Sequence, residues 1–312
     1  MITEFSAEAK EYGQQALRAF EAAGGDDLIQ RAEADPAARE ALTGKVLAEL
    51  GAWELEPRSD TDSLEAAAVL CRSAGYWALP YPVAERLSRP ADTAADGLVV
   101  VADTRPAAAI SGIDIDWAAV TLDGRRSTVS GLASAGPAFV SQLELAPLDQ
   151  SGGPDLALAL VLPCWTLLGM LDRALALTIA HVQSRHQFGQ PLSGFQSVQF
   201  QLTDGEVERA GLEMLAKYAL WSVGQDRPEA IDDALALRMA ALEAAEVVFR
   251  VTHQLHGAVG FCNETTLSWL SRYSQPLRRL PFGLSATRDV LTRRIGHNGL
   301  TGLFSTDRAT VS

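Results

Sequence analysis

Cysteine is scarce in this sequence. The 312 residues include only three cysteines, Cys71, Cys164 and Cys262, which are odd in number and lie far apart. They form neither the paired framework of a disulfide-stapled domain nor a C-x-x-C metal knuckle. We therefore expect the protein to work in a reducing compartment.

Basic residues are also few for a chain of this length. Lys and Arg total 26 against 39 Asp and Glu, which gives a net charge of −13 and a sequence pI near 4.8. Proteins that bind nucleic acid need a basic face for the phosphates. The composition therefore predicts no nucleic-acid partner, although it says nothing about the fold.

We expect neither a signal peptide nor a membrane span in this sequence. The first residues, MITEFSAEAKEYG, lack the basic start and the apolar run of a signal peptide. The longest apolar stretch, Leu156 to Leu171, is shorter than the roughly 20 residues that a bilayer requires. Pro163 and Gly169 also interrupt it. We expect a cytoplasmic protein in which this stretch is buried.

What the chain does contain is helical periodicity at both ends and short apolar runs in between. Up to about residue 90, apolar residues recur at helical spacing, and Asp35-Pro36 marks the start of a helix. From 91 to 151, short apolar runs alternate with turn residues, and the pair Asp123-Gly124 predicts a hairpin. We expect a helical region followed by a small antiparallel β module.

Long helical segments dominate the rest of the chain. Four are expected, at roughly 156–185, 195–224, 228–256 and 284–296. Small apolar residues on one face permit close antiparallel packing, which predicts a helical bundle. Pro163 either starts the first of these helices or kinks it. Because so small a β module leaves Trp165, Trp221 and Trp269 without obvious cover, we expect the isolated chain to self-associate or aggregate.

The stretch from Ser184 to Asp204 carries the clearest chemical signal. It places Arg185 at the end of one helix, then a turn containing Gly189, then Gln196 at the start of the next helix. An Arg fork matches two phosphate oxygens, and the first turn of a helix offers unpaired N–H donors. This corner can therefore hold a phosphate. The alternative is an Arg side chain that caps the carbonyls of its own helix.

A second signal lies in residues 253–272, after the third long helix. Gln254 precedes a glycine turn made of Gly257, Ala258 and Gly260, in which backbone donors can approach a phosphate or ribose. The alternative is a glycine that merely ends a helix. His253 and His256 are three residues apart with no acid between them, so no metal site is expected.

Together the two stretches resemble the acyl-CoA dehydrogenase family. The first matches its R-x-x-F-G-x-x-x-x-x-F-Q signature, and the second its Q-x-x-G-G-x-G-[FY]-x-x-[DE] element, with Ala258 in place of the second glycine. The resemblance implies a mainly α fold with an N-terminal helical domain (1–90), a reduced β middle module (91–151) and a C-terminal antiparallel four-helix bundle domain (152–312).

The resemblance also implies a chemistry, which is FAD-dependent α,β-dehydrogenation of an acyl-CoA thioester. The residues that it assigns to the flavin are Arg185, Phe188, Gln196, Gln254, Gly257, Ala258 and Gly260. A carboxylate must remove the α-proton. The family's two positions for this base fall on Ala159 and near Pro281, and no Asp or Glu occurs in 156–171 or 265–288. We therefore expect this chain to supply no catalytic residue. The segments with which relatives wrap the flavin ring are also missing from the β module.

Three functions remain open. In the first, the chain is the base-lacking subunit of a hetero-oligomeric enzyme, resembling the short subunit of actinobacterial steroid-CoA dehydrogenases. That resemblance implies an α2β2 heterotetramer with a full-length acyl-CoA dehydrogenase subunit, a bulky steroid- or cholesterol-derived acyl-CoA, and electron-transfer flavoprotein as acceptor. In the second, a self-sufficient homo-oligomer uses Asp155 or Glu264 as its base. In the third, the chain is a helical scaffold without catalytic function.

Overall fold

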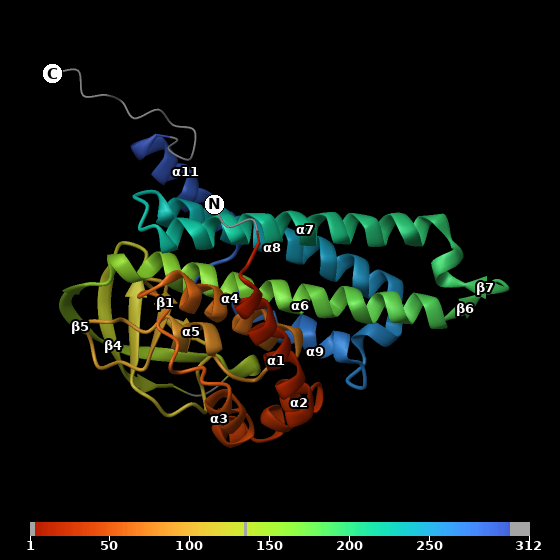
Figure 1. Ribbon diagram of the computed structural model, residues 1–312, viewed down its shortest axis with the longest axis horizontal. Coiled ribbons are helices and arrows are strands. Elements are labelled where there is room, and N and C mark those ends of the chain that lie inside the picture. Colours follow the sequence, from red (N-terminus) through yellow and green to blue (C-terminus); the bar gives the residue numbers. More distant parts are fainter. Residues whose placement is uncertain (1–3, 134–135, 300–312) are drawn as a thin grey trace.

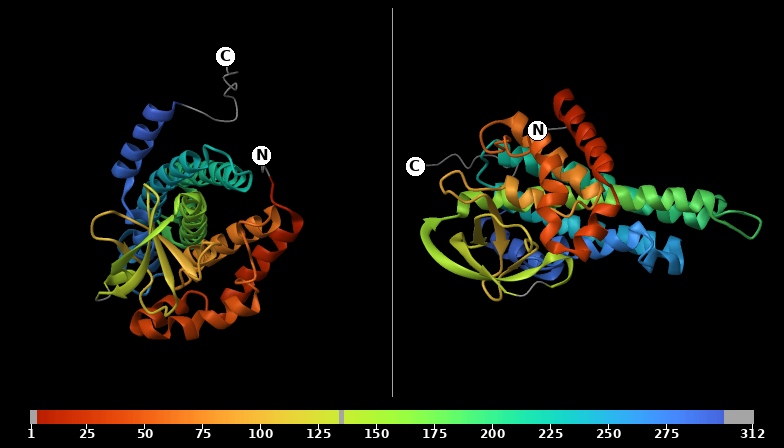
Figure 2. Two further views of the ribbon diagram at one scale, coloured as in Figure 1. Left: turned by 90° about the vertical axis from the view of Figure 1, so that its left-hand side faces the viewer. Right: turned by 90° about the horizontal axis from the view of Figure 1, so that it is seen from below.

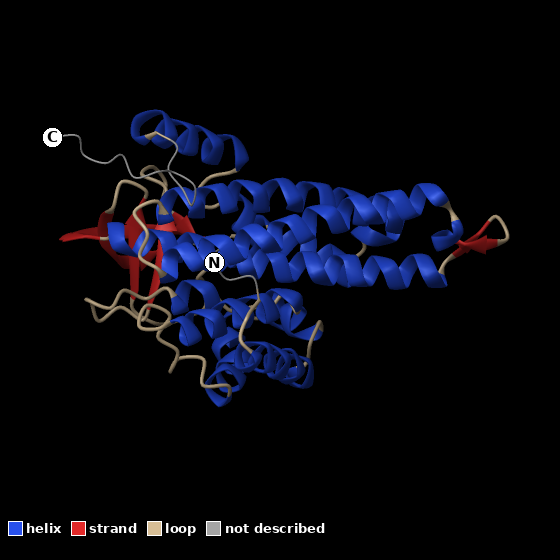
Figure 3. Cartoon of the chain, turned by 45° about the horizontal axis from the view of Figure 1, so that its top comes forward, coloured by secondary structure: helices blue, strands red, loops and turns tan. Residues whose placement is uncertain are grey.

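The computed structural model describes residues 4–133 and 136–299. The ends of the expected N-terminal and C-terminal regions, residues 1–3 and 300–312, lie outside these ranges. Long helices run side by side through the molecule, a five-stranded sheet covers one end, and a small hairpin forms the opposite tip (Figures 1 and 3).

The N-terminal region is helical, as predicted. Its helices are α1 (Ala7–Ala23), α2 (Asp27–Ala34), α3 (Arg39–Glu49), α4 (Thr61–Tyr76) and α5 (Val83–Leu87). Side chains cap some of these starts: Asp60 accepts a hydrogen bond from the Ser63 N–H at 2.7 Å at the start of α4, and Asp35 accepts one from Ala37 at the 3-10 turn ahead of α3. The helix start predicted at Asp35-Pro36 is confirmed, because Pro36 opens a short 3-10 turn that runs into α3.

The middle region forms a mixed sheet in the order β1-β3-β4-β5-β2. Its strands are β1 (Gly97–Val101), β2 (Ala107–Ala108), β3 (Trp117–Thr121), β4 (Arg125–Leu132) and β5 (Ser141–Ser151). The predicted hairpin is confirmed, since Asp123-Gly124 joins antiparallel β3 and β4 and Gly124 has φ +84°. The prediction that the β module is purely antiparallel is wrong. β1 and β3 pair in parallel, because residues 102–116 carry the chain back to the edge where β1 began.

The C-terminal region contains the four long helices predicted, within a few residues of their expected ends. They are α6 (Leu156–Ser184), α7 (Gln196–Gly224), α8 (Ala230–His256) and α11 (Leu284–Asn298), with α9 (Thr266–Tyr273) and α10 (Gln275–Arg279) as short links. α6 lies at the centre, with α4, α7 and α8 packed around it (Figure 2). Pro163 lies inside α6, so the alternative that it starts the helix is wrong.

α6 is long and apolar enough to cross a bilayer by length and composition. However, 83% of its most apolar window is buried inside the protein. Trp165 of this helix is completely buried and packs on Phe5 with ring centroids 5.3 Å apart. The expectation that Trp165 lacks cover is therefore wrong, because the N-terminal segment covers it. Trp221 and Trp269 are partly buried, and Arg227 and Arg272 lie over their rings.

Two glycines let α4 and α6 touch backbone to backbone. A Cβ added to Gly75 would lie 1.9 Å from the Thr166 carbonyl oxygen, and one added to Gly169 would lie 1.9 Å from the Arg72 carbonyl oxygen. No side chain fits at either position. The N-terminal region is thereby pressed directly onto the central helix of the bundle.

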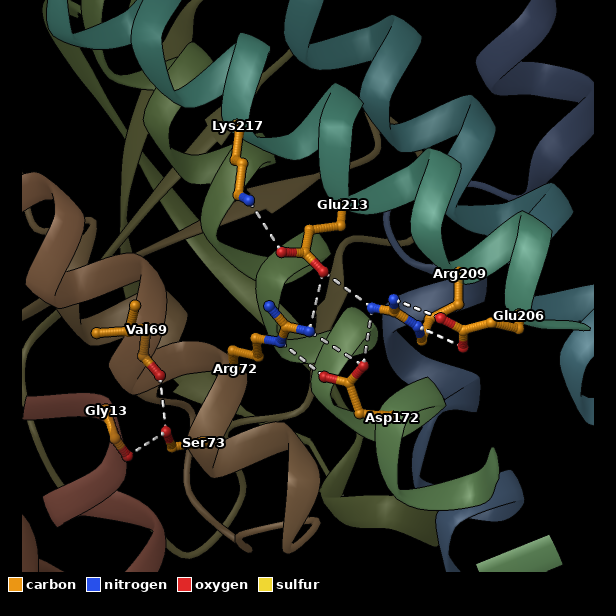
Figure 4. Close-up of polar contacts among 9 residues, drawn as sticks. All are labelled: Gly13, Val69, Arg72, Ser73, Asp172, Glu206, Arg209, Glu213 and Lys217. Carbon is orange, nitrogen blue, oxygen red and sulfur yellow. Dashed lines mark hydrogen bonds and ion pairs between the residues drawn. The ribbon is translucent and has the colours of Figure 1, made fainter. Parts of the chain in front are cut away.

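A partly buried network of charges joins the same elements (Figure 4). Arg72 of α4 binds Asp172 of α6 at 2.6 Å and Glu213 of α7 at 3.2 Å, and Arg209 and Lys217 bind Glu213 at 2.9 and 3.0 Å. Burial opposes ionisation of Glu213, but the three cations prevail and lower its pKa to about 2. The network fixes how α4, α6 and α7 pack.

Candidate functional site

The two sequence motifs lie at the same end of the bundle. α6 and α8 both end there, on the right in Figure 1. Their ends are in contact: His181 of α6 stacks on His256 of α8 with ring centroids 4.3 Å apart. A small apolar cluster of Val182, Val198, Val251 and Leu255 ties the ends of α6 and α8 to the start of α7. The Arg185 corner and the glycine turn therefore follow helix ends that pack against each other.

Arg185 ends α6 and carries a free side chain. Its backbone N–H donates to the His181 carbonyl at 2.8 Å, and its carbonyl accepts from Leu192 N–H at 2.8 Å. Its guanidinium is exposed and makes no hydrogen bond or ion pair with any residue in the described part of the chain. The alternative of an Arg side chain that caps its own helix is therefore not realised here, and the cation is available to an external anion.

The residues between the two helices form the β6 (His186–Gln187) and β7 (Gln190–Pro191) hairpin. Phe188 at its tip is 90% exposed with φ +53°, and Gly189 has φ +83° with no atom near the place a Cβ would occupy. Gln196 is the first residue of α7 and is exposed. The hairpin thus presents an aromatic ring to the solvent after Arg185, and the start of α7 presents an amide.

The glycine turn follows α8 as the 3-10 turn Gly257–Phe261. Gly257 ends the helix with φ +63° and open space around its Cα, whereas Gly260 is buried and a Cβ there would lie 2.9 Å from the Cβ of His256. The helix-ending alternative is thus realised, and it leaves room for a ligand to approach the backbone. Ala258 is exposed on this turn, and Gln254 is exposed in the last turn of α8 just before it.

This corner suits the phosphate and adenosine parts of a dinucleotide such as FAD. It offers a guanidinium for a phosphate, an exposed Phe188 ring for an aromatic base, and amides at Gln196 and Gln254, and none of these polar groups pairs with a residue in the described part of the chain. Burial lowers the pKa of His256 and His253, so both imidazoles stay neutral near pH 7.

Ala159 and Pro281, the two positions assigned to the missing base, line one cavity. The cavity has a volume of ≈ 120 Å³ and lies where the N-terminal helices, the sheet and the bundle meet. Neither alternative base lines it. Asp155 is buried in ion pairs with Arg126 and Arg58, and Glu264 is exposed on the loop before α9.

A different carboxyl group does line this cavity, and no sequence motif pointed to it. Glu85 of α5 borders the same space, and burial raises its pKa despite the nearby Arg39. Arg238 and Tyr273 are also lining residues. These four residues come from α3, α5, α8 and α9, so only the folded chain brings them together.

Comparison with known proteins agrees with the motifs. Residues 160–291 match the family described as acyl-CoA dehydrogenase, C-terminal domain. The acyl-CoA dehydrogenase FadE27 of Mycobacterium tuberculosis is 29% identical over 216 residues, which are 65% of this chain and 56% of FadE27. The chain therefore spans about half the length of the curated relatives it matches.

Solved structures show the fold. A chain of the Tcur3481-Tcur3483 steroid ACAD G363A variant superposes with TM-score 0.79 at 21% identity, covering 94% of this chain and 99% of that one. A chain of the ChsE4-ChsE5 complex from Mycobacterium tuberculosis gives 0.74 at 18% identity, covering 95% and 99%. The expected resemblance and fold are confirmed.

Proposed function

We propose that this chain, a relative of the acyl-CoA dehydrogenases whose family cofactor is FAD, is the base-lacking subunit of a hetero-oligomeric member of that family. It contributes its corner to FAD, and a full-length partner subunit supplies the catalytic carboxylate. The observation that carries the proposal is that the chain keeps the residues expected to bind the cofactor but lacks the catalytic base. The corner keeps an unpaired Arg185, whereas Ala159 and Pro281 leave the shared cavity without a carboxylate at either inherited position.

The missing base matters because the reaction cannot start without it. Removal of an α-proton from a thioester needs a carboxylate within hydrogen-bond reach of the α-carbon. The methyl group of Ala159 and the ring of Pro281 cannot accept a proton. A chain that only held the fold would have no use for an exposed, unpaired Arg185 beside an exposed Phe188. The pattern of loss and retention therefore favours a subunit that donates part of a flavin site.

A partner also explains an exposed apolar stripe on α7. Phe200, Val207 and Met214 recur every seven residues on this helix and are 60%, 62% and 53% exposed. Asp204 and Glu208 flank the stripe and pair with no basic residue in the described ranges. Two copies of this stripe would bring like charges together, so the surface favours a different chain with basic side chains at its edge.

Two related structures support the finer details of the proposal. One neighbour is a steroid ACAD and another is a complex of two differently named proteins. We extend this to an α2β2 heterotetramer that acts on a bulky steroid- or cholesterol-derived acyl-CoA in the cytoplasm. Electron-transfer flavoprotein would reoxidise the flavin.

Co-expression tests this function. The chain is produced alone and together with a full-length acyl-CoA dehydrogenase encoded beside it, and the flavin absorbance of each purified sample is recorded. We expect a yellow complex containing both chains and little flavin on the isolated chain. A stable, flavin-loaded homo-oligomer that oxidises an acyl-CoA would overturn the proposal.

A further inference from the structure

Histidines gather at the end of the bundle that carries the two motifs. The chain has five histidines, and four of them lie at or directly beside the ends of α6 and α8: His181, His186, His253 and His256. The planes of His181 and His256 are 18° apart in their stack, and His253 stacks on Phe261 of the glycine turn with ring centroids 4.4 Å apart. The first stack is thus a direct contact between the helix that ends at Arg185 and the helix that ends at the glycine turn.

Two buried threonines hold the His256 ring in place. Its Nδ1 lies 2.9 Å from the Thr252 carbonyl oxygen and 3.5 Å from the Thr178 hydroxyl of α6. A carbonyl oxygen only accepts hydrogen bonds, so Nδ1 carries the proton of the neutral ring. The Thr178 hydroxyl donates its own hydrogen to the Ala174 carbonyl at 2.7 Å, so its oxygen also faces His256 as an acceptor. A further proton can therefore bind only at Nε2.

The surroundings of the stack oppose that further proton. Burial lowers the pKa of both rings, and the Arg185 charge lowers the pKa of His181 further. The hydrogen bond to Thr252 raises the pKa of His256 in part, whereas His181 and His253 lower it. No carboxylate in the described part of the chain is among the charges that act on either ring.

The elements packed around the stack do not supply a compensating acid. The glycine turn and the first eight residues of α7 contain no ionisable side chain. The ionisable groups on the other neighbouring segments are His186 in the hairpin, Cys262 after the glycine turn, Arg272 and Tyr273 in α9, and Asp26, which accepts a hydrogen bond from Thr266. Asp26 is already paired with Arg173 at 2.7 Å. Asp204 and Glu264, the next acids along α7 and after the turn, are exposed.

We propose that His181 and His256 are positioning residues, which hold the Arg185 corner against the glycine turn while both rings are neutral and release it when they are protonated. Two neutral rings pack like any aromatic pair. Two protonated rings would place like charges face to face beside Arg185, so separation of the helix ends would be favoured. This inference rests on the proposed function for its effect on flavin, but not for its effect on the helix ends.

The sign of the pH dependence follows from the direction of the two pKa shifts. Both pKa values lie below 6.5, the value of an unperturbed histidine, so separated helix ends bind protons more readily than packed ones. Order at the corner should therefore be complete above pH 6.5 and be lost as the pH falls below it.

Hydrogen exchange measured by mass spectrometry tests this on the full-length chain, between about pH 5 and pH 8 and with rates corrected for intrinsic exchange. Peptides that cover 178–186 and 250–258 report on the helix ends, and a peptide from α4 is the internal reference. We expect opening of the helix ends to increase below pH 6.5 by up to about tenfold per pH unit for each proton taken up. α4 should stay protected.

His181→Phe is the decisive variant, because it keeps a flat ring in the stack but cannot take up a proton. Its helix ends should be as protected near the acid end of the range as near the neutral end. His181→Ala removes the ring and should loosen the helix ends at every pH. His297→Phe, on α11 and outside the stack, is the matched control and should keep the native pH dependence.

Two outcomes overturn the proposal: helix ends of the native chain that are equally protected across the pH range, or a His181→Phe variant that loosens in acid as the native chain does. If His181→Phe does not fold, His256→Phe provides the same comparison. In the assembled complex, flavin retention should fall over the same pH range, and His181→Phe should prevent the fall. A complex without flavin at any pH would contradict the proposed function, whereas hydrogen exchange would still decide the role of the stack.

Discussion

Ala159 of α6 and Pro281, which follows α10, border the same cavity although they lie in distant parts of the chain. The two positions at which the family resemblance puts a base therefore converge in space. Alanine and proline occupy these two positions, so neither of them supplies a carboxylate to the cavity. The closest acid to this site is Glu85, which lines the cavity and comes from the N-terminal region. This relationship sets the sharpest prediction.

The isolated chain should have no acyl-CoA dehydrogenase activity, even with FAD added. In the assembled complex, Glu264→Gln should leave the rate constant nearly unchanged, because Glu264 is exposed outside the cavity. Removing the partner's base should reduce turnover about 10²–10⁴-fold. Reduction of an electron acceptor checks each rate. Activity of the isolated chain that Glu85→Gln abolishes would instead identify a self-sufficient enzyme with Glu85 as its base.

Arg185→Ala should weaken FAD retention in the complex. The guanidinium is unpaired within the described chain, so a phosphate would be its main partner, and losing a charge-assisted contact costs about 1.5–3 kcal/mol. Flavin content after dialysis measures the effect. Arg105→Ala, an exposed arginine beside the sheet at the other end of the molecule, should retain FAD as the native chain does. Equal flavin loss in both variants would contradict a specific role for Arg185.

Phe200→Ser and Met214→Ser should weaken assembly with the partner without unfolding the chain. Both side chains are more than half exposed, and burying such a side chain contributes about 1.5–3 kcal/mol. Size-exclusion chromatography with light scattering measures the complex, and thermal unfolding of the isolated chain checks its fold. Leu132→Ser, an exposed apolar residue on β4, is the control. A complex of normal stability in the Phe200 and Met214 variants would show that the partner binds elsewhere.

Gly169→Ala should destabilise the fold. The added methyl group would meet the Arg72 carbonyl, and such overpacking costs about 1–3 kcal/mol. Chemical unfolding gives the free energy. Gly211→Ala, a helical glycine on α7 with no atom within 4 Å of its added Cβ, should be neutral or stabilising by up to about 1 kcal/mol. If the two variants unfold alike, α4 and α6 do not cross as closely as described.

The charge network should make stability depend on acid pH. The pKa of Glu213 is about 2 in the folded chain, whereas an unperturbed glutamate has a pKa of 4.5, so the unfolded chain binds the proton more readily. Its contribution is therefore complete above pH 4.5 and is lost as pH falls from 4.5 towards 2. We expect a loss on the order of 2 kcal/mol. Glu213→Gln should flatten the unfolding free energy across this range, and an unchanged pH profile would exclude the mechanism.

The sequence by itself was sufficient for the order and type of the elements. Apolar spacing located the four long helices, and Asp123-Gly124 located a hairpin, because both signals arise from residues close together in the chain. The motifs around Arg185 and Gly257 could also be found from the sequence, because each consists of residues close together in the chain. The flavin-binding roles of those residues remain predictions that the variants above test.

Only the tertiary structure decided which distant residues meet. The parallel pairing of β1 and β3 depends on the path of residues 102–116, and the cover over Trp165 depends on Phe5. Likewise, Glu85, Arg238 and Tyr273 face one cavity because three layers meet there, and no periodicity in the sequence records that meeting. Local patterns determine elements, whereas a site made from several elements exists only once burial of their apolar faces has fixed how they pack.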